Sequence, residues 1–574
     1  MKIFVKKQFL PIIFIACLTG CAAHPERSKD VAIGANPAQA SSIPAYLASY
    51  YYSLSVHHSL NGRPNEAIGA LEKALEADPR SAFLAMELAA LYGESGELQK
   101  AISLCEKTLT ANGRDADTHF LLARLYMNAK NYPNALREFL KVNELEPQQA
   151  DALLFTGILY GEAQDYEKAL LTFRKLLDFD PDHLMGNYYL AKTLKVNQQY
   201  KEAERMYKKT LAIQALFEPA VLDLGRLYER EEKKDLALEQ YRAFLKINPQ
   251  GINVRFRLAG LLFKMKKPVE AEKELREILD QAKGNRELAY RLSMFYLENK
   301  RYEGAAGILR ELLIVYSDDQ RLRFLLGSAY EGKKDYQAAI AELKKIPPES
   351  GELYPSAQMS ISLMLKNLDQ SEAAIANLSK ALANRREVAN FYILLASLYE
   401  EKKEFLKAEE TLKTGLEFSP GVAMHFELGV LYDKMGRFQD SIMAMRRVLE
   451  IDGNNAEAMN FIGYTYADRG INLEEAENLI KKALTLKPGN AYMLDSLGWV
   501  YFQQNKLEEA IKYLKEAAVE LPQDATIAEH LGDAYAKAGQ VSAARKIYKE
   551  LMRLNPENKV LSQKMQKLTG KTQD

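Results

Sequence analysis

Cysteine is scarce in this chain of 574 residues, which contains only Cys17, Cys21 and Cys105. Cys17 lies within an N-terminal leader and Cys21 directly follows it. Cys105 therefore has no partner in the body of the chain, and an intramolecular disulfide is excluded. The stability of the fold must come from packing.

Excess charge is also absent. Lys and Arg together number 77 and Asp and Glu together number 77, which leaves no formal net charge. Proteins that bind nucleic acid normally show a basic excess or a basic stripe, because they neutralise phosphates. The composition gives no support for a nucleic-acid partner. The length would accommodate about three or four domains of ordinary size.

Long apolar runs are missing beyond the first twenty residues. Residues 9–18 form a short apolar core, and Lys2, Lys6 and Lys7 precede it. This layout is typical of a secretory signal, so residues 1–20 are predicted to be a signal peptide and are excluded from the fold. The core is shorter than the roughly 20 residues that span a bilayer. The mature chain is predicted not to be transmembrane.

The signal ends in Leu18-Thr19-Gly20-Cys21, which resembles the bacterial lipobox. That resemblance implies cleavage before Cys21 and acylation of its thiol and its new amine. Several acyl chains hold a protein firmly on a membrane, whereas one chain holds it only marginally. Ala22 follows the cysteine, and by the same resemblance the absence of Asp there favours the periplasmic face of the outer membrane. An ordinary secretory signal with a coincidental cysteine is the alternative.

Residues 21–47 are rich in Ala, Ser, Pro and Gly and contain few large apolar residues. This composition predicts a flexible tether, lipidated at its first residue. The repetitive part of the chain begins at about Ala48.

The rest of the chain repeats at a 34-residue step, which brings the same residue types into the same slots. One unit contains Leu122-Ala123-x2-Tyr126, and then Ala135, Phe139 and Pro147. Three further units read Thr156-Gly157-x2-Tyr160 with Ala169, Phe173 and Pro181; Leu224-Gly225-x2-Tyr228 with Ala237, Tyr241 and Pro249; and Leu531-Gly532-x2-Tyr535 with Ala544, Tyr548 and Pro556.

These slots resemble those of tetratricopeptide repeats (TPRs). The small residue lets the two helices of a unit approach, the large residues fill the space between them, and the proline ends the second helix. The predicted fold is all-α, a right-handed TPR α-solenoid of about fifteen units from Ala48 to Asn558. Because a single unit cannot bury its apolar face, the array forms one stacked core.

The repeat register slips in three places. One residue is gained across 346–355, one is lost in the unit at 390–421, and one is gained within 468–472. The first slip contains Pro347-Pro348, which breaks a second helix. We predict an N-terminal TPR array over 48–346, a Pro-rich break over 347–354, a C-terminal TPR array over 355–558, and a capping helix and tail over 559–574. The break is either a joint between two arrays or a longer loop with unbroken stacking.

Catalytic motifs are another absence. Gly570-Lys571-Thr572 looks like the end of a phosphate loop, but Met565 stands where the loop needs glycine and no strand precedes it. His57 and His58 are adjacent without a metal-binding motif, and Cys105 falls in a packing slot where it is expected to be inert. We predict no enzyme activity, no cofactor and no metal site.

Binding is the remaining function. In TPR arrays the first helix of each unit faces a concave groove, and the resemblance points to its second, fifth, ninth and twelfth positions. These slots hold Tyr52, Phe83, Met86, Phe120, Met127, Leu154, Ile158 and Tyr188 in the first five units. Later units hold Phe256, Phe263, Tyr290, Met294, Phe324, Phe426, Tyr464, Tyr492, Trp499 and Phe502.

Aromatic and Met side chains dominate binding hot spots, so these slots predict a groove for an extended or loosely structured protein partner. Core packing between repeats is the alternative for any one ring, and the convex face remains a second possible binding surface. Lys192, Lys195 and Arg226 occupy the same kind of slot in neighbouring units. They could hold a carboxylate such as a chain terminus, or form a solvated face.

Three C-terminal motifs are more particular than the general repeat. They read Gly463-Tyr464-Thr465-Tyr466-Ala467-Asp468-Arg469-Gly470, Leu494-Asp495-Ser496-Leu497-Gly498-Trp499-Val500-Tyr501 and Glu529-His530-Leu531-Gly532-Asp533. They resemble a family of long bacterial TPR outer-membrane lipoproteins, some of which act as adaptors for a periplasmic carboxyl-terminal-processing protease. The specific resemblance covers about the last hundred residues.

Two functions follow from this resemblance and from the groove. The first is a membrane-anchored scaffold that brings a protease and its substrates together and so raises their effective concentration. The second is an assembly factor for an envelope machine, such as a secretin, a pilus or a polysaccharide exporter. An adaptor should speed substrate loss, whereas an assembly factor should leave degradation unchanged.

Overall fold

A computed structural model describes residues 43–570, and every regular element in that range is an α-helix. Thirty helices form fifteen helix-turn-helix pairs, and α31 (Lys559–Gly570) follows the last pair. The predicted all-α TPR solenoid is confirmed for these residues. The predicted signal peptide and residues 21–42 of the predicted tether, Cys21 included, lie outside the described residues, as do residues 571–574. Residues 43–47, which the sequence predicts to be part of the tether, belong to the first helix instead.

The first helices of the pairs have similar lengths. They are α1 (Ile43–Leu60), α3 (Ala82–Glu94), α5 (Ala116–Asn128), α7 (Ala150–Glu162), α9 (Leu184–Val196), α11 (Glu218–Arg230), α13 (Ile252–Lys264), α15 (Arg286–Glu298), α17 (Gln320–Gly332), α19 (Leu353–Asn367), α21 (Ala389–Glu401), α23 (Val422–Lys434), α25 (Ala456–Asp468), α27 (Ala491–Gln503) and α29 (Ala525–Lys537).

The second helices alternate with them along the chain. They are α2 (Pro64–Ala77), α4 (Leu98–Ala111), α6 (Tyr132–Leu145), α8 (Tyr166–Phe179), α10 (Tyr200–Ile213), α12 (Lys234–Ile247), α14 (Pro268–Ala282), α16 (Tyr302–Val315), α18 (Tyr336–Leu343), α20 (Ser371–Asn384), α22 (Phe405–Phe418), α24 (Phe438–Ile451), α26 (Leu473–Leu486), α28 (Leu507–Glu520) and α30 (Val541–Leu554).

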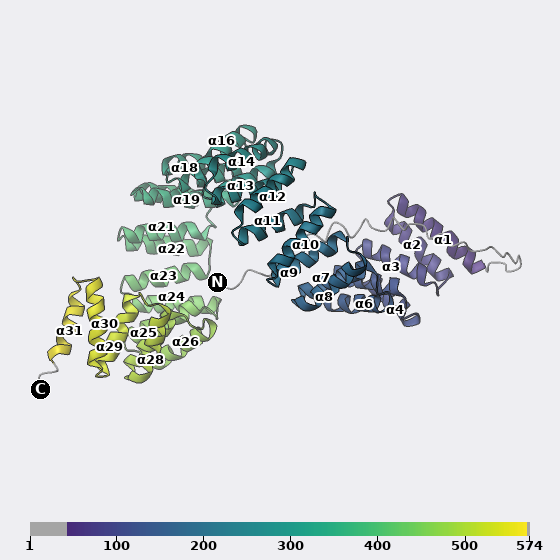
Figure 1. The fold of residues 1–574 in the computed structure, drawn as a ribbon. Coiled ribbons are helices and arrows are strands. Elements are labelled where there is room, and N and C mark those ends of the chain that lie inside the picture. The colour runs from purple at the N-terminus through teal and green to yellow at the C-terminus, as the bar shows by residue number, and fades with distance from the viewer. Residues whose placement is uncertain (1–42, 571–574) are drawn as a thin grey trace, which may run out of the picture. The chain divides into compact units, whose positions relative to one another are not determined.

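The chain divides into two compact units, Met1–Ile278 and Leu279–Asp574, and the boundary lies inside α14. Within each unit, most helices that follow one another along the chain pack side by side (Figure 1). First helices of neighbouring pairs also touch, as α3 does with α5 and α25 with α27. A row of first helices therefore forms one face of each unit.

The small residue of each repeat sits where the two helices of a pair approach most closely. A Cβ atom added to Gly157 in α7 would lie 2.5 Å from the Phe173 ring of α8, and one added to Gly532 would lie 2.6 Å from Tyr548. Phe173 is fully buried. The predicted roles of the small and large slots are confirmed at these positions.

The turn inside each pair contains one residue with a left-handed backbone. These residues are Gly62, Gly96, Lys130, Gln164, Gln198, Glu232, Lys266, Lys300, Lys334, Asp369, Lys403, Gly436, Gly470, Asn505 and Gly539, with Asn472 as an additional one. In the turn at Lys130, the amide of Asn131 donates to the carbonyl oxygen of Tyr126 at 2.8 Å, which is the bond that closes a Schellman motif.

The spacing of these residues is 34 from Gly62 to Lys334 and then changes at three places. One residue is gained before Asp369, one is lost before Gly436, and one is gained between Gly470 and Asn505. These are the three slips in register that the sequence predicts.

The Pro-rich segment shortens one second helix. Helix α18 ends at Leu343 after 8 residues, whereas most second helices have 14. Helix α19 starts at Leu353, so Pro355 lies in its first turn, where proline is tolerated. One apolar cluster joins Ile346 and Tyr354 to Phe391 across this segment. The domain bounds at 346 and 355 stay a prediction.

Candidate protein-binding pocket in the C-terminal unit

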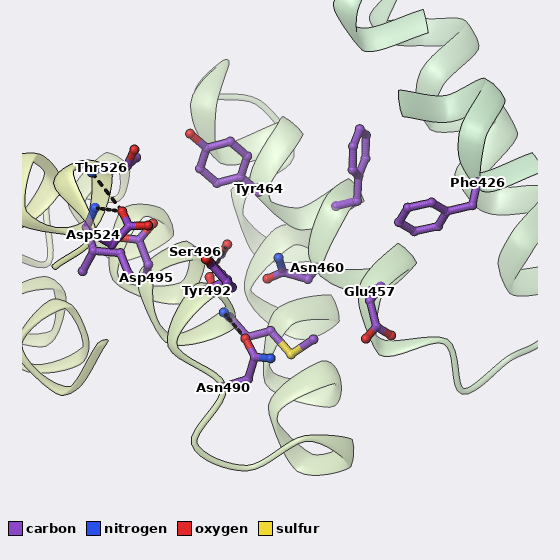
Figure 2. Close-up of a pocket in the computed structure, with 13 residues that line it drawn as sticks. Phe426, Glu457, Asn460, Tyr464, Asn490, Tyr492, Asp495, Ser496, Asp524 and Thr526 are labelled. Atoms are coloured by element: carbon purple, nitrogen blue, oxygen red, sulfur yellow. Dashed lines mark hydrogen bonds between the residues drawn. The ribbon is translucent and has the colours of Figure 1, made fainter. Parts of the chain in front are cut away.

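Four successive first helices, α23, α25, α27 and α29, surround a cavity of about 500 Å³ in the second unit (Figure 2). The lining combines aromatic rings, carboxylates, amides and hydroxyls. It consists of Phe426, Glu457, Asn460, Phe461, Tyr464, Asn490, Tyr492, Met493, Asp495, Ser496, Asp524, Thr526 and Ile527.

The repeat places these side chains at regular positions. Glu457, Asn460 and Tyr464 are the second, fifth and ninth residues of α25. Residues at this spacing share one face of a helix, and Figure 2 shows the three in a row along α25. Tyr492 and Asp495 hold the second and fifth positions of α27. The pocket therefore lies on the face that the first helices form.

Two of the lining residues also start helices. The Asn490 side chain accepts a hydrogen bond from the amide of Met493 at 3.2 Å, and so caps α27. The Asp524 carboxylate accepts from the amides of Thr526 and Ile527 at 2.9 and 3.0 Å, and so caps α29. Capping fixes where each helix begins and which residues it presents to the cavity.

Aromatic rings form much of the wall. Phe426 of α23 and Phe461 of α25 meet edge to face, with ring centroids 6.4 Å apart. Tyr464 is half-buried, whereas Tyr492 is 59 % exposed at the rim. Such rings give large contact areas at low entropic cost. The cavity therefore presents an apolar surface that is open to solvent on one side.

The carboxylates give the cavity an acidic character. Burial, and then the charges of Asp468, Asp495 and Asp433, raise the pKa of Tyr464 to about 12. The hydrogen bond from the Lys487 ammonium is the main cause that holds the pKa of Glu457 below its usual range. Asp495 is buried, and both of its oxygens lie 3.0 Å from Nδ1 of His530.

A stack of rings supports Asp495 from behind. His530 lies on Trp499 with ring centroids 4.2 Å apart, and Trp499 lies on Phe502 at 4.5 Å and an interplanar angle of 7°. The Lys537 ammonium covers the far face of this stack, 4.3 Å from the Phe502 centroid. The stack fixes the His530 ring, and the His530 ring fixes Asp495.

The pocket lining includes the side chain of Ser496. Ser496 is buried, and its hydroxyl donates to the carbonyl oxygen of Tyr492 at 2.8 Å. Among residues 43–570, no group of three or more His, Cys, Asp or Glu side chains could hold a metal ion. No helix in the same range is long and apolar enough to cross a membrane.

The predicted groove residues differ widely in exposure. Phe83, Met294, Tyr492 and Arg226 are exposed, whereas Leu154, Ile158, Tyr188, Lys192, Phe256 and Phe263 are buried. The half-buried ones are Tyr52, Met86, Phe120, Met127, Lys195, Tyr290, Phe324, Phe426, Tyr464, Trp499 and Phe502. The pocket brings together three of them, Phe426, Tyr464 and Tyr492.

Several of the other predicted residues pack against one another or against the core. Tyr52 meets Phe83 edge to face at 5.3 Å, and Phe120 meets Phe139 at 5.5 Å. Trp499 and Phe502 pack beside the pocket and do not line it. These rings therefore contribute to packing on the face of the first helices.

The three predicted cations lie together in the first unit, around the carboxylate of Asp223, which the repeat positions did not predict. The Asp223 carboxylate is 2.9 Å from the Lys195 ammonium and 3.4 Å from the Arg226 guanidinium, and it accepts from the Tyr188 hydroxyl at 3.0 Å. Lys192 is buried over the rings of Tyr188 and Tyr189, and burial is the main cause that lowers its pKa to about 8.

Cys105 is 1 % exposed, and burial raises its pKa to about 12. A thiol of this kind carries almost no thiolate at neutral pH. The inert packing role predicted for Cys105 is confirmed.

The polar residues of the pocket were not predicted, because binding was inferred from the apolar, aromatic and cationic residues of the groove slots. Glu457, Asn460 and Asp495 occupy those same slots and could have been found there. Asn490 and Asp524 could have been found as capping residues directly before two first helices.

Paired helices in a stacked array, with a cavity on the face of the first helices, define a repeat scaffold that binds other proteins. The chain belongs to the tetratricopeptide-repeat family. Sequence models described as tetratricopeptide repeat match residues 60–117, 94–156, 222–286, 256–319, 290–356, 389–421, 422–455 and 496–559, which together cover more than half of the chain.

Two characterised sequences are similar to parts of the chain. The TPR repeat-containing protein PA4667 of Pseudomonas aeruginosa is 29 % identical over 171 residues, which cover 29 % of this chain and 29 % of that protein. Anaphase-promoting complex subunit CDC16 of Saccharomyces cerevisiae is 32 % identical over 102 residues, which cover 16 % of this chain and 12 % of that protein. The matches thus span less than a third of either relative.

Among solved structures, the Cut9-Hcn1 hetero-tetramer of APC/C has a chain that is 16 % identical with a TM-score of 0.34, over 84 % of this chain and 95 % of that one. Pseudomonas aeruginosa pilF is 21 % identical with a TM-score of 0.32, over 37 % of this chain and 96 % of that one. Scores this low carry no argument about function. TPR solenoids are generally non-catalytic scaffolds for protein interactions.

Proposed function

We propose that this protein is a periplasmic adaptor. Acyl chains on Cys21 would anchor it to the bacterial envelope, at the periplasmic face of the outer membrane. The pocket between α23, α25, α27 and α29 would hold an extended segment of a partner protein and present it to a carboxyl-terminal-processing protease.

One observation carries this proposal. The three motifs that resemble adaptor lipoproteins lie in three successive repeats, and residues from all three meet in or beside the same pocket. Tyr464 of the first motif and Asp495 of the second line the cavity, and His530 of the third motif contacts Asp495. A shared sequence signature that converges on one cavity supports a shared binding role.

The size of the cavity suits this role. Small binding sites in proteins usually enclose about 300 to 1,000 Å³, and this cavity of about 500 Å³ would take a few side chains of an extended segment. A segment held there by a membrane-bound scaffold stays at high effective concentration near a second protein on the same array. The scaffold needs no catalytic group for this purpose.

A degradation assay tests the adaptor. The purified chain is mixed with the carboxyl-terminal-processing protease of the same cell and with a protein whose level rises when the chain is deleted. We expect the chain to speed the loss of that protein. Tyr492→Ala, which removes an exposed ring from the pocket rim, should reduce the acceleration about tenfold.

The matched control is Tyr46→Ala, because Tyr46 is 67 % exposed and lies in α1, outside the pocket. It should leave the acceleration unchanged. If the native chain does not alter degradation, and an envelope machine fails to assemble without it, then the assembly-factor hypothesis is correct and the adaptor is not.

The anchor has its own test. Cys21→Ser should move the protein from the membrane fraction to the soluble fraction, with an unchanged helical signal in circular dichroism, because several acyl chains are needed for firm attachment. Retention of this variant on membranes would disprove the lipid anchor.

A further inference from the structure

The charges around the pocket are strongly biased. Glu457, Asp495 and Asp524 line it, and none of its described lining residues is Lys or Arg. Two further carboxylates, Asp433 and Asp468, act electrostatically on Tyr464 in its wall. Any partner that enters the cavity therefore meets an excess of carboxylates.

Nearby cations balance only part of this charge. Lys487 pairs with Glu457, and the Arg469 guanidinium lies 3.9 Å from Asp433 and 3.6 Å from Asp468. Neither cation lines the cavity. Two cations thus stand against five carboxylates, which leaves an excess of negative charge at the cavity.

Other groups in the lining also favour a donor or a cation. The side-chain oxygen of Asn460 is buried and has no hydrogen-bond partner among the described residues. Such an acceptor is costly unless a ligand or a water molecule donates to it. Phe426, Tyr464 and Tyr492 add ring faces, which attract ammonium and guanidinium groups.

We propose that the pocket recognises a Lys or Arg side chain in an extended segment of the partner protein, flanked by apolar side chains. This inference rests on the proposed function and names the chemistry of its ligand. The cation would lie near Asp495 and the free oxygen of Asn460, and the flanking side chains would lie on the aromatic wall. A carboxylate in the same place would be repelled by Asp495 and Asp524.

The segment must be part of a protein, because the cavity is larger than one cationic group needs. It extends over four successive first helices, and most of its exposed lining is apolar. An extended chain presents alternate side chains at a spacing that matches a row of such positions. A single amine would leave the aromatic wall uncovered.

Designed peptides test this inference. Three fluorescein-labelled peptides with blocked ends share the sequence Gly-Leu-Ser-X-Ser-Phe-Gly, in which X is Lys, norleucine or Glu, so that the Leu, X and Phe side chains of an extended chain point to the same side. Their binding to the mature protein is measured by fluorescence anisotropy at low and high salt. We expect the Lys peptide to bind at least about tenfold more tightly than the norleucine peptide, with the difference falling in high salt. The Glu peptide should bind most weakly.

Two variants locate the effect in the pocket. Asp495→Asn keeps an acceptor for His530 but removes the charge, and should weaken the Lys peptide about tenfold while leaving the norleucine peptide unchanged. Asn460→Asp adds a carboxylate to the lining and should strengthen the Lys peptide. This gain of affinity cannot arise from misfolding.

Glu508→Gln is the control, because Glu508 is exposed on α28 and does not line the pocket. If Glu508→Gln weakens binding of the Lys peptide as much as Asp495→Asn does, the net charge of the protein explains the affinity, and the inference is wrong. Binding of lysine amide as tightly as the Lys peptide would overturn the requirement for a protein segment.

The two proposals fail in different ways. If the Lys and norleucine peptides bind equally, and Tyr492→Ala weakens both, the pocket still binds protein segments but does not recognise a cation. If no peptide binds, and Tyr492→Ala leaves degradation unchanged, both proposals are wrong.

Discussion

The two helices of each repeat approach closely, and this packing can be tested by replacing glycine with alanine at two sites. The same substitution should lower the stability at one site and raise it at the other. Gly157 and Gly69 both lie in the middle of a helix in the first unit. A Cβ atom at Gly157 would lie 2.5, 2.7 and 2.8 Å from three atoms of the Phe173 ring, whereas one at Gly69 would have no neighbour within 4 Å.

The magnitudes follow from two opposing effects. Alanine is more favourable than glycine inside a helix by about 1 kcal/mol. At Gly157 the added methyl group also forces Phe173 to move, and overpacking of this kind costs about 1 to 3 kcal/mol. Phe173 is fully buried and lies parallel to Tyr189 with ring centroids 6.2 Å apart, so it has little room. The difference between these two effects leads us to expect that Gly157→Ala destabilises its repeat by up to about 2 kcal/mol, whereas Gly69→Ala stabilises its own by about 1 kcal/mol.

Hydrogen exchange measured by mass spectrometry is the suitable assay, because a long repeat array does not unfold in a single transition. Amides of α7 and α8 should exchange roughly ten times faster in Gly157→Ala, and amides of α2 should exchange more slowly in Gly69→Ala. Urea unfolding provides a second measurement. If both variants shift exchange in the same direction, close contact between the helices does not determine the choice of glycine.

Three other predictions concern a buried lysine, a buried thiol and a pair of half-buried rings. Burial lowers the pKa of Lys192 to about 8, so the folded state binds this proton less tightly than the unfolded chain does. Lys192→Met should therefore stabilise the protein by up to about 3 kcal/mol at pH 7, and the gain should shrink as the pH rises from about 8 towards 10.5, as urea titrations at several pH values would show. The raised pKa of Cys105 predicts that a maleimide labels this thiol in urea but not in the native protein; rapid native labelling would refute it. Replacement of Trp499 and Phe502 together by Ala should weaken capture of the partner by a few kcal/mol if these rings are binding hot spots. An early melting transition with unchanged binding per folded molecule would show that they serve as packing residues instead.

The repeat could be predicted in detail because each of its slots has a local physical cause. Gly157 is small because Phe173 leaves no space, and the three register slips appear both in the sequence and in the left-handed turn positions. Second helices end where the sequence places proline or a polar capping segment. The pattern of small, large and helix-ending residues recurs in each repeat, so a single sequence contains many examples of it.

The pocket could be predicted only in part. Phe426, Tyr464 and Tyr492 were found by their slots, but the same slots also contain Tyr188 and Phe256, which are buried. Exposure depends on how successive pairs stack, and the pattern within one repeat does not contain that information.

Charge partners were equally hidden from the sequence. Asp223 lies between Lys195 and Arg226. It is the sixth residue of α11, outside the second, fifth, ninth and twelfth positions that point to the groove. The contact between Asp495 and His530 joins residues 35 positions apart in different repeats. Contacts between different repeats depend on how the repeats stack, and the sequence alone does not give that arrangement.

The left-handed turns have a consequence for how the array opens. Glycine adopts this backbone without strain, whereas other residues lose about 1 kcal/mol or more. Gly62 and Gly96 hold the first two turns and Gly539 the last, while every turn from Lys130 to Lys403 uses another residue. An outermost repeat has a neighbour on one side only and is therefore the first to fray. Glycine turns thus stand at both ends of the array, where stacking is weakest, as well as at Gly436 and Gly470, whereas every non-glycine turn lies in a repeat that is held from both sides.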